Sequence, residues 1–285
     1  MNTSDLAALR LLARRDGALC TLVGIEGSFS RAIGAHLAVA WDGEIAGSLA
    51  DGCLEAELAL QARAMRTTGP QVIRYGRGSP VIDFRLPCGS GLDVLIDPAP
   101  DRSAIRRVMS ALTERRPAEL PLPTRSLPRR PCLPPLRLDI FGNGPEMEAM
   151  ARLASAAGIE RRQTPQSRLQ LGKRPALTPP DAWTAVVLLF HDHDWEMPVL
   201  DWALESPAFY IGAIGGARIR QRRQERLALR YNPSQLSRLR GPVGLIPSAR
   251  DPATLAMSIL AEIMRDFDRT YAAQSPQPRL SHVTT

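Results

Sequence analysis

Two of the four cysteines lie in glycine-rich segments, where an activated or exposed thiol could be functional. Cys53 stands where a glycine turn enters a predicted helix, and a helix N-terminus favours the thiolate over the thiol. Cys88 lies between a proline and a glycine, in a loop that we expect to be exposed. The alternative for a lone cysteine is a small buried hydrophobic residue. We expect that alternative for Cys20, inside a predicted strand, and incidental exposure for Cys132.

Four segments in the first half of the chain are rich in glycine: residues 24–31, 47–55, 75–79 and 87–91. Glycine allows a positive φ and a close approach of the backbone, so the N–H groups of such loops can cradle an anion. The alternative is that these glycines only turn the chain between short strands. Because two of the four segments also carry a cysteine, we favour a ligand-binding role.

A further motif, Gly142-Asn143-Gly144, follows a predicted strand and opens a helical pattern, as in the phosphate-binding turn of a dinucleotide site. Met147 replaces the third small residue of that turn. The acidic ribose ligand, expected about 20 residues later, is also missing from a stretch that contains Arg161 and Arg162. We therefore interpret the motif as a degenerate nucleotide pocket, with NAD(P) binding as the weaker alternative.

Two polar groups of the second half have two interpretations each. The run His-Asp-His-Asp at residues 191–194 follows a predicted buried strand, where ligands collect in open α/β sheets. It is a metal site or, more commonly for so local a pair, a polar loop. A predicted helix over residues 218–229 presents either a solvated face or a surface for anions or a partner. Its arginines are Arg218, Arg220, Arg222, Arg223 and Arg226.

The elements around these motifs predict an α/β protein with two different parts. In the first part, strands mix with helices over residues 54–65 and 103–112, and Asp42-Gly43 joins a hairpin, which indicates an α+β domain. In the second part, predicted strands alternate with helices, which indicates a Rossmann-like parallel sheet. The predicted strands cover residues 18–25, 37–41, 44–48, 71–74, 92–96, 136–141, 186–190 and 209–214.

Prolines predict the boundary between the two parts. Seven of the 19 residues from 117 to 135 are proline, which excludes a helix or a central strand and favours a semi-extended linker. We therefore predict a first domain over residues 1–116, a proline-rich linker over 117–135, a Rossmann-like domain over 136–272 and a flexible tail over 273–285.

Composition excludes several classes of protein. With 44% hydrophobic and 23% charged residues, the chain is neither disordered nor fibrous. The formal net charge is +7, and all basic residues except Lys173 are arginine, which reflects either a genome rich in G and C or an affinity for anions. The 14 aromatic residues are not interleaved with a basic stripe, which argues against a nucleic-acid partner. No signal peptide or apolar run of about 20 residues is present, so we expect no membrane association and a cytoplasmic location.

The glycine-rich segments together resemble the XdhC/CoxI family, the accessory proteins of xanthine dehydrogenase and related molybdenum hydroxylases. In the first domain the resemblance rests on residues 26–35, 47–55, 75–80 and 86–93. In the second it rests on residues 141–144, 190–193, 210–215 and 241–245, which look like the Rossmann-like domain of the family.

This resemblance implies a chaperone and not an enzyme. Such a protein binds and protects the molybdenum cofactor, a molybdopterin dithiolene with a phosphate. It supports sulfuration of the cofactor, with a cysteine desulfurase as partner, and inserts it into a xanthine dehydrogenase-type molybdenum hydroxylase. The family also implies assembly into a homodimer.

The resemblance makes Cys53 and Cys88 the candidate sulfur ligands of the metal. Arg31 and the N–H groups of the glycine loops would hold the phosphate, and the motif at Gly142 could hold a nucleotide form of the pterin. The candidate cofactor-binding residues are Cys53, Cys88, Gly27, Ser28, Arg31, Gly52, Glu55, Gly89, Gly142, Gly144 and His191. Two other functions stay open: an NAD(P)-dependent oxidoreductase that uses the second domain, and a thiol-based redox or metal sensor.

Overall fold

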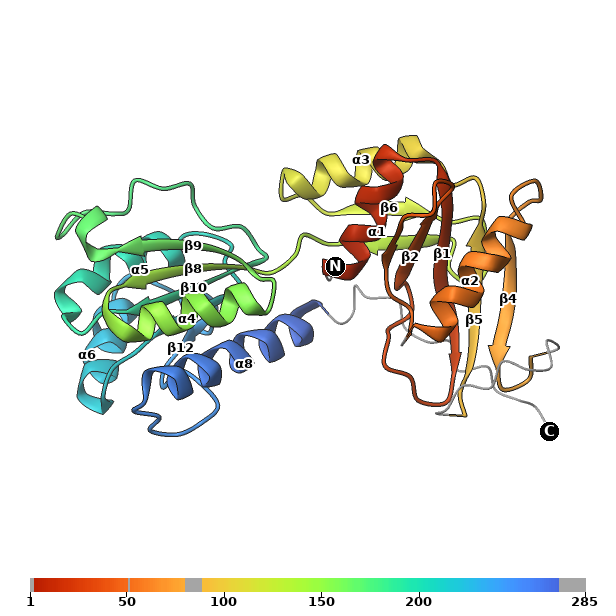
Figure 1. Ribbon diagram of the computed structural model, residues 1–285. Coiled ribbons are helices and arrows are strands. Elements are labelled where there is room, and N and C mark those ends of the chain that lie inside the picture. Colours follow the sequence, from red (N-terminus) through yellow and green to blue (C-terminus); the bar gives the residue numbers. More distant parts are fainter. Residues whose placement is uncertain (1–2, 51, 80–88, 272–285) are drawn as a thin grey trace. The chain divides into compact units, whose positions relative to one another are not determined.

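The computed structural model describes residues 3–50, 52–79 and 89–271 (Figure 1). The chain divides into two compact units between Pro134 and Pro135. None of the helices within the described ranges is long and apolar enough to cross a bilayer.

A five-stranded antiparallel sheet, in the order β3-β2-β1-β5-β4, is the frame of the first unit. The central strand β1 pairs with β2 on one side and with β5 on the other. The β2–β3 hairpin confirms the turn predicted at Asp42-Gly43, where Gly43 has a φ of 101°. The strands are β1 (Gly17–Glu26), β2 (His36–Ala40), β3 (Ile45–Gly47), β4 (Gln71–Gly76) and β5 (Gly91–Asp97).

Helices cover both faces of this sheet. On one face, α1 (Thr3–Arg14) and α3 (Arg102–Thr113) pack against Leu19 and Val23 of β1. On the other face, α2 (Cys53–Ala64) packs against Cys20 and Leu22. Burial raises the pKa of the Cys20 thiol to about 12, so this cysteine is an inert core residue, as predicted.

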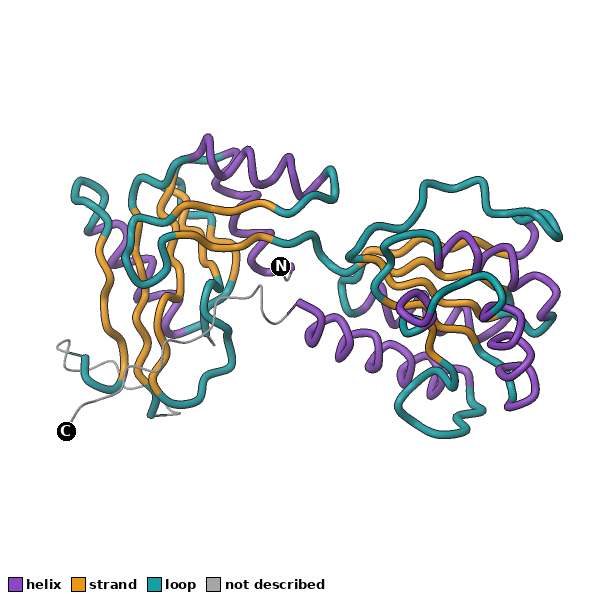
Figure 2. The backbone as a smooth tube through the Cα atoms, turned by 180° about the vertical axis from the view of Figure 1, so that it is seen from behind, coloured by secondary structure: helices purple, strands orange, loops and turns teal. Residues whose placement is uncertain are grey.

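The proline-rich segment is not a free linker, and that prediction is wrong. It forms a two-stranded antiparallel ribbon of β6 (Ala118–Pro121) and β7 (Arg129–Cys132). Both strands of such a ribbon are edges, where proline is tolerated because no inner ladder needs its missing N–H. Figure 2 shows the ribbon lying across the strands of the sheet. Leu120, Leu122 and Cys132 join the core beneath α1 and α3, so Cys132 is buried and not exposed as expected.

A buried ion pair ties this ribbon to the start of the chain. The carboxylate of Asp5 accepts hydrogen bonds from Nη2 of Arg130 and from the backbone N–H of His36, both at 3.0 Å. Arg130 also donates from Nε to the carbonyl of Gly34 at 3.0 Å. Burial raises the pKa of Asp5, and Arg130 opposes that effect. The pair therefore joins α1, β2 and β7 in the protein interior.

Removal of one partner of this pair should be costly. Arg130→Met leaves the Asp5 charge buried without its counter-ion, so we expect a loss of about 3–5 kcal/mol in the free energy of unfolding, measured with urea. Arg129→Met, at the neighbouring and exposed position, should cost less than about 1 kcal/mol. Equal losses in the two variants would contradict this role.

The second unit is a five-stranded parallel sheet in the order β12-β11-β10-β8-β9, with helices on both faces, as predicted. Helices α4 and α8 cover one face, while α5 and Leu227 of α6 cover the other. The strands are β8 (Arg137–Gly142), β9 (Glu160–Pro165), β10 (Thr184–Leu189), β11 (Tyr210–Ala213) and β12 (Leu239–Arg240). The α-helices are α4 (Gly144–Ala156), α5 (Glu196–Leu204), α6 (Ala217–Ala228), α7 (Pro233–Leu236) and α8 (Pro252–Tyr271).

Candidate functional site

Strand register brings the glycine-rich segments of the first unit to one end of its sheet. Glu26, at the end of β1, lies opposite Gly91, the start of β5, and Gly91 lies opposite Gly76, the end of β4. On the other side, β3 ends at Gly47 beside the start of β2. The loops that follow or precede these residues therefore open at the same end, marked by the arrowhead of β4 in Figure 1.

Arg74 holds two of these loops together. Its Nη1 donates to both carboxylate oxygens of Asp93 at 3.0 Å, and it forms a further ion pair with Glu26. Its Nε donates to the carbonyl of Arg77 at 2.9 Å. The guanidinium lies against Gly91, where any Cβ would collide with it. Arg74 is thus a structural part of the site that sequence reasoning missed.

Three of the predicted site residues, Gly27, Ser28 and Gly89, lie at the same end of the sheet as Arg74. The hydroxyl of Ser90 donates to the carbonyl of Ser28 at 2.6 Å, and a Cβ at Gly27 would lie 3.2 Å from Ser90 Oγ. Gly89 is exposed, and a Cβ there would lie 4.0 Å from a guanidinium nitrogen of Arg77. The Arg77 side chain is 66% exposed. The structure therefore places Gly27, Ser28 and Gly89 together, beside an arginine that faces solvent.

Glu55 organises the loop that leads into α2. One of its oxygens accepts from the N–H groups of Leu49 and Ala50 at 2.9 and 2.6 Å, and the other accepts from Gly52 at 2.7 Å. These amides are therefore occupied by the protein's own carboxylate and do not form the open anion cradle expected from the glycines. Direct contact of Glu55 with a cofactor stays a prediction.

Arg31 joins the same network through Ser48. Its Nη2 donates to Ser48 Oγ at 3.1 Å, and this hydroxyl lies 3.2 Å from Oε1 of Glu55. Gly52 has a φ of 98°, and nothing lies within 4 Å of a Cβ placed there. Arg31, Gly52 and Glu55 thus lie in one loop network at the N-terminus of α2, where Cys53 is the first helical residue. The side chain of Cys53 and the whole of Cys88 lie outside the described residues.

The charge of Glu55 should make this loop sensitive to acid. Burial alone would raise the pKa of Glu55, but the N–H groups of Ala50, Gly52 and Leu49 hold it below its ordinary value. A depressed pKa gives stability that is complete above the unfolded-state value of about 4.3 and is lost as the pH falls through the folded-state value. Glu55→Gln should therefore be less stable than the wild type at neutral pH, with a gap that closes below about pH 4.

Urea unfolding of both proteins across this pH range tests the expectation. Glu44→Gln, at an exposed position on the same unit, is the matched control and should show no such gap. A gap for Glu55→Gln that does not change with pH would rule out the charge as its cause.

The remaining predicted residues meet in the second unit. The sheet order reverses direction between β8 and β10, and ligands of open α/β sheets bind at such a point, beyond the carboxyl ends of the strands. Gly142 ends β8 opposite Leu189 of β10. Nε2 of His191 lies 3.2 Å from Oε2 of Glu146, in the first turn of α4. The structure therefore brings Gly142, Gly144 and His191 together.

Glu146, which sequence reasoning missed, changes the interpretation of this motif. Its Oε2 lies 3.5 Å from the position of a Cβ on Gly144, so a carboxylate stands over the glycine turn. A pyrophosphate would meet a like charge there, although a helix N-terminus otherwise favours anions. The ribose-binding acid is also absent from the end of β9, where Thr164 and Pro165 stand. Both observations count against NAD(P).

A buried ion pair lies near the carboxyl ends of β10 and β11. Both interpretations of the helix, a solvated face and a binding surface, require Arg223 to be exposed, but it is 4% exposed and pairs with buried Glu196 at 2.8 Å. It also donates to the carbonyls of Ala213 and Ile214, and Nδ1 of His193 lies 2.7 Å from Glu196. In the part of the chain that the structure describes, no three His, Cys, Asp or Glu side chains gather as metal ligands.

The turn after β8 leaves no room for a side chain. Gly142 has a φ of 141°, and a Cβ there would lie 2.5 Å from the carbonyl oxygen of Leu189. We therefore expect Gly142→Ala to lower the midpoint of thermal unfolding of the second unit by several degrees, because β8 and β10 must separate. Gly216→Ala, with open space around its Cβ, is the control and should change little. Equal midpoints of thermal unfolding for Gly142→Ala and Gly216→Ala would contradict the close approach of Gly142 to Leu189.

Comparison with known proteins identifies the family. The model of the XdhC and CoxI family matches residues 11–76, and that of the XdhC Rossmann domain matches residues 138–263. The molybdenum cofactor insertion chaperone PaoD of Escherichia coli K12 is 35% identical over an aligned length of 275, and the match covers 89% of this chain and 84% of PaoD. The chain belongs to the XdhC/CoxI family. The resemblance drawn from the glycine-rich segments is thereby confirmed.

A solved structure supports the fold of this XdhC/CoxI protein. A protein from Bacillus halodurans, described as a xanthine dehydrogenase, superposes on this chain with a TM-score of 0.74 at 21% sequence identity. The match covers 97% of this chain and 98% of the Bacillus halodurans chain. The predicted class, an α+β part followed by a Rossmann-like part, is confirmed. The first family match contains Arg31, Cys53 and Glu55 but ends before Cys88.

Proposed function

We propose that this protein is a molybdenum cofactor chaperone that inserts its cargo into a xanthine dehydrogenase-type molybdenum hydroxylase. It acts as an accessory factor and not as an enzyme. The observation that carries the proposal is the strand register, which gathers the glycine-rich segments at one end of the first sheet. Membership of the family and similarity to PaoD support the same function.

The phosphate of the cofactor would be held by arginines at this end of the sheet. The loop amides of Leu49, Ala50 and Gly52 already bind Glu55, so positive charge is the main attraction left for an anion. Among the described residues Arg31 donates one side-chain hydrogen bond, to Ser48, which leaves most of its five N–H donors for a phosphate. The exposed Arg77, whose guanidinium lies 4.0 Å from the carboxylate of Glu26, offers a second guanidinium beside Gly89.

The metal end of the cofactor would face the two cysteines. Cys53 is the first residue of α2, a position that favours a thiolate, and Cys88 belongs to the fourth glycine-rich segment. Thiolates are soft ligands that suit a metal already bound by a dithiolene. Gly27, Ser28, Gly52 and Gly89 would line the approach to them.

Three further parts of the proposal rest on the family alone. They are sulfuration of the bound cofactor, a cysteine desulfurase as the sulfur donor, and assembly into a homodimer. NAD(P) chemistry in the second unit gains no support, since Glu146 stands over the glycine turn. The residues Gly142, Gly144 and His191 stay candidates for a nucleotide form of the pterin.

Cofactor retention tests the proposal directly. Purified protein is mixed with molybdenum cofactor, and the metal and pterin that co-elute on gel filtration are quantified. We expect near-stoichiometric retention by the wild type and at least about tenfold less by Cys53→Ala/Cys88→Ala, because soft metal ligands are lost. Cys132→Ala, which removes a buried thiol, is the control and should retain the cofactor. Absence of retention by the wild type would refute the chaperone function.

A further inference from the structure

Four arginines form a ridge on the second unit. Arg218, Arg222 and Arg226 are spaced by four residues along α6, so they lie on one side of the helix, and Arg230 continues the spacing just beyond its end. At 1.5 Å per residue, the ridge is about 18 Å long. Arg218, Arg222, Arg226 and Arg230 are all exposed. We call these four residues the arginine ridge.

The ridge lacks sufficient counter-charge within the unit. Arg230 pairs with Asp201 at 2.8 Å, but the other three ridge arginines form no ion pair with a described residue. The single acidic residue of α6, Glu225, accepts a hydrogen bond from Gln221 at 2.9 Å. Like charges four residues apart destabilise a helix. An external acidic group would relieve this repulsion.

The neighbouring Arg223 shows what a structural arginine looks like on the same helix. Its side chain is 3% exposed, pairs with Glu196, and donates to backbone carbonyls at the end of β11. The fold therefore uses Arg223 internally and leaves the arginine ridge to solvent.

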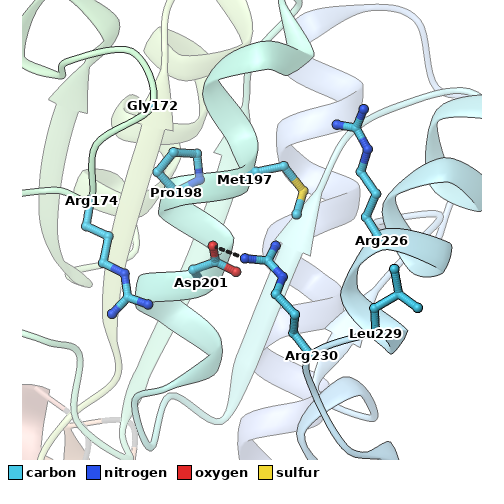
Figure 3. Close-up of a pocket in the computed structure, with 8 residues that line it drawn as sticks. All are labelled: Gly172, Arg174, Met197, Pro198, Asp201, Arg226, Leu229 and Arg230. Carbon is cyan, nitrogen blue, oxygen red and sulfur yellow. Dashed lines mark hydrogen bonds and ion pairs between the residues drawn. The ribbon is translucent and has the colours of Figure 1, made fainter.

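An open pocket lies at the C-terminal end of the ridge (Figure 3). It measures about 380 Å³, and Met197, Pro198 and Leu229 contribute apolar surface to it. Leu229 is 86% exposed, and with Met197 and Pro198 it forms the apolar part of this open surface. An apolar pocket edged by arginines is typical of protein–protein interfaces, where arginine is enriched and charged rims surround an apolar centre.

Other ligands fit this surface less well. Single-stranded nucleic acid binding needs aromatic side chains for stacking, and none is interleaved with the ridge arginines of α6. A small free anion would find Arg174 and Arg230 of the pocket already paired, with Glu205 and Asp201. It would also leave Leu229 exposed. A protein segment with both acidic and apolar side chains satisfies the ridge and the pocket together.

We propose that the arginine ridge docks an acidic segment of the client hydroxylase, with an apolar side chain of that segment in the pocket beside Leu229. This inference rests on the proposed function, because that function defines the client. It assigns recognition of the client to the second unit, through a surface separate from the Gly142 turn of that unit.

The test measures binding of a purified, cofactor-free xanthine dehydrogenase-type hydroxylase to the full chain at low and high salt. Arg222→Glu/Arg226→Glu should weaken binding at least about tenfold near 50 mM NaCl, and wild-type affinity should fall as salt rises. Leu229→Ala should weaken binding equally at both salt concentrations. Arg10→Glu/Arg106→Glu makes the same charge change at exposed positions of the first unit and should stay within about twofold of the wild type.

Cofactor retention by the same variants separates the two proposals. A wild type that retains no cofactor refutes the chaperone function, whatever the ridge does. Failure of the wild type to bind the hydroxylase, or equal binding by the wild type and the ridge variant, overturns the docking surface. An equal loss in the control variant also overturns it, because net charge alone would then explain the effect. Duplex DNA binding that depends on the ridge, with hydroxylase binding unchanged, would assign the ridge to nucleic acid instead.

Discussion

The pairing of β1 with both of its neighbours is the constraint on which the first unit depends. Alternate residues of β1 enter two different cores, Leu19 and Val23 on one face and Cys20 and Leu22 on the other. A slip of one residue would exchange these faces and would separate the glycine-rich loops at the sheet end. The register of β1 against β5 shifts between Leu22 and Gly24, and the pairing then continues to Glu26. Gly24 lies close against the side chain of Asp93.

In both units an acidic side chain occupies the place that a bare glycine loop would offer to an anion. Glu55 accepts hydrogen bonds from the loop amides before α2, and Glu146 stands over Gly144 at the start of α4. Glycine content alone is therefore a poor measure of anion affinity. In the first unit, Arg31 and Arg77 supply the charge that the occupied backbone cannot. Among the described residues of this turn, Glu146 has only His191 as a neighbour of this kind, with Nε2 at 3.2 Å from its carboxylate.

Sequence patterns of short range predicted most of the fold. The Asp42-Gly43 hairpin and the alternation of strands and helices after residue 136 are local signals. The β6–β7 ribbon was missed because the burial of Leu120 and Cys132 depends on packing against α1 and α3. The sequence of the proline-rich segment itself does not show this tertiary packing. Arg222 and Arg223 are equally polar neighbours, and only the tertiary contact with Glu196 makes one of them buried.

The candidate site follows the same division. The motifs located Gly27, Arg31 and Gly52 in loops, and Glu55 in the first turn of α2, and the structure joins these parts at one end of the sheet. Arg74 was missed because it stands within a strand, and nothing in its local sequence indicates that Asp93 and Glu26 lie opposite it. A carboxylate in the first turn of a helix, as at Glu146, is so common that residue type alone gives no signal of a filled crevice.

The buried pair of Asp5 and Arg130 also bears on how the protein is made. The two residues are separated by 125 positions, so the charge of Asp5 cannot be neutralised on a ribosome until almost the whole first unit has emerged. Long-range contacts of this kind slow folding, because a large loop must close before the contact forms. During synthesis, the contact between α1 and β7 therefore forms only after β7 has emerged from the ribosome. The core of the first unit is then completed as the second unit begins to leave the exit tunnel.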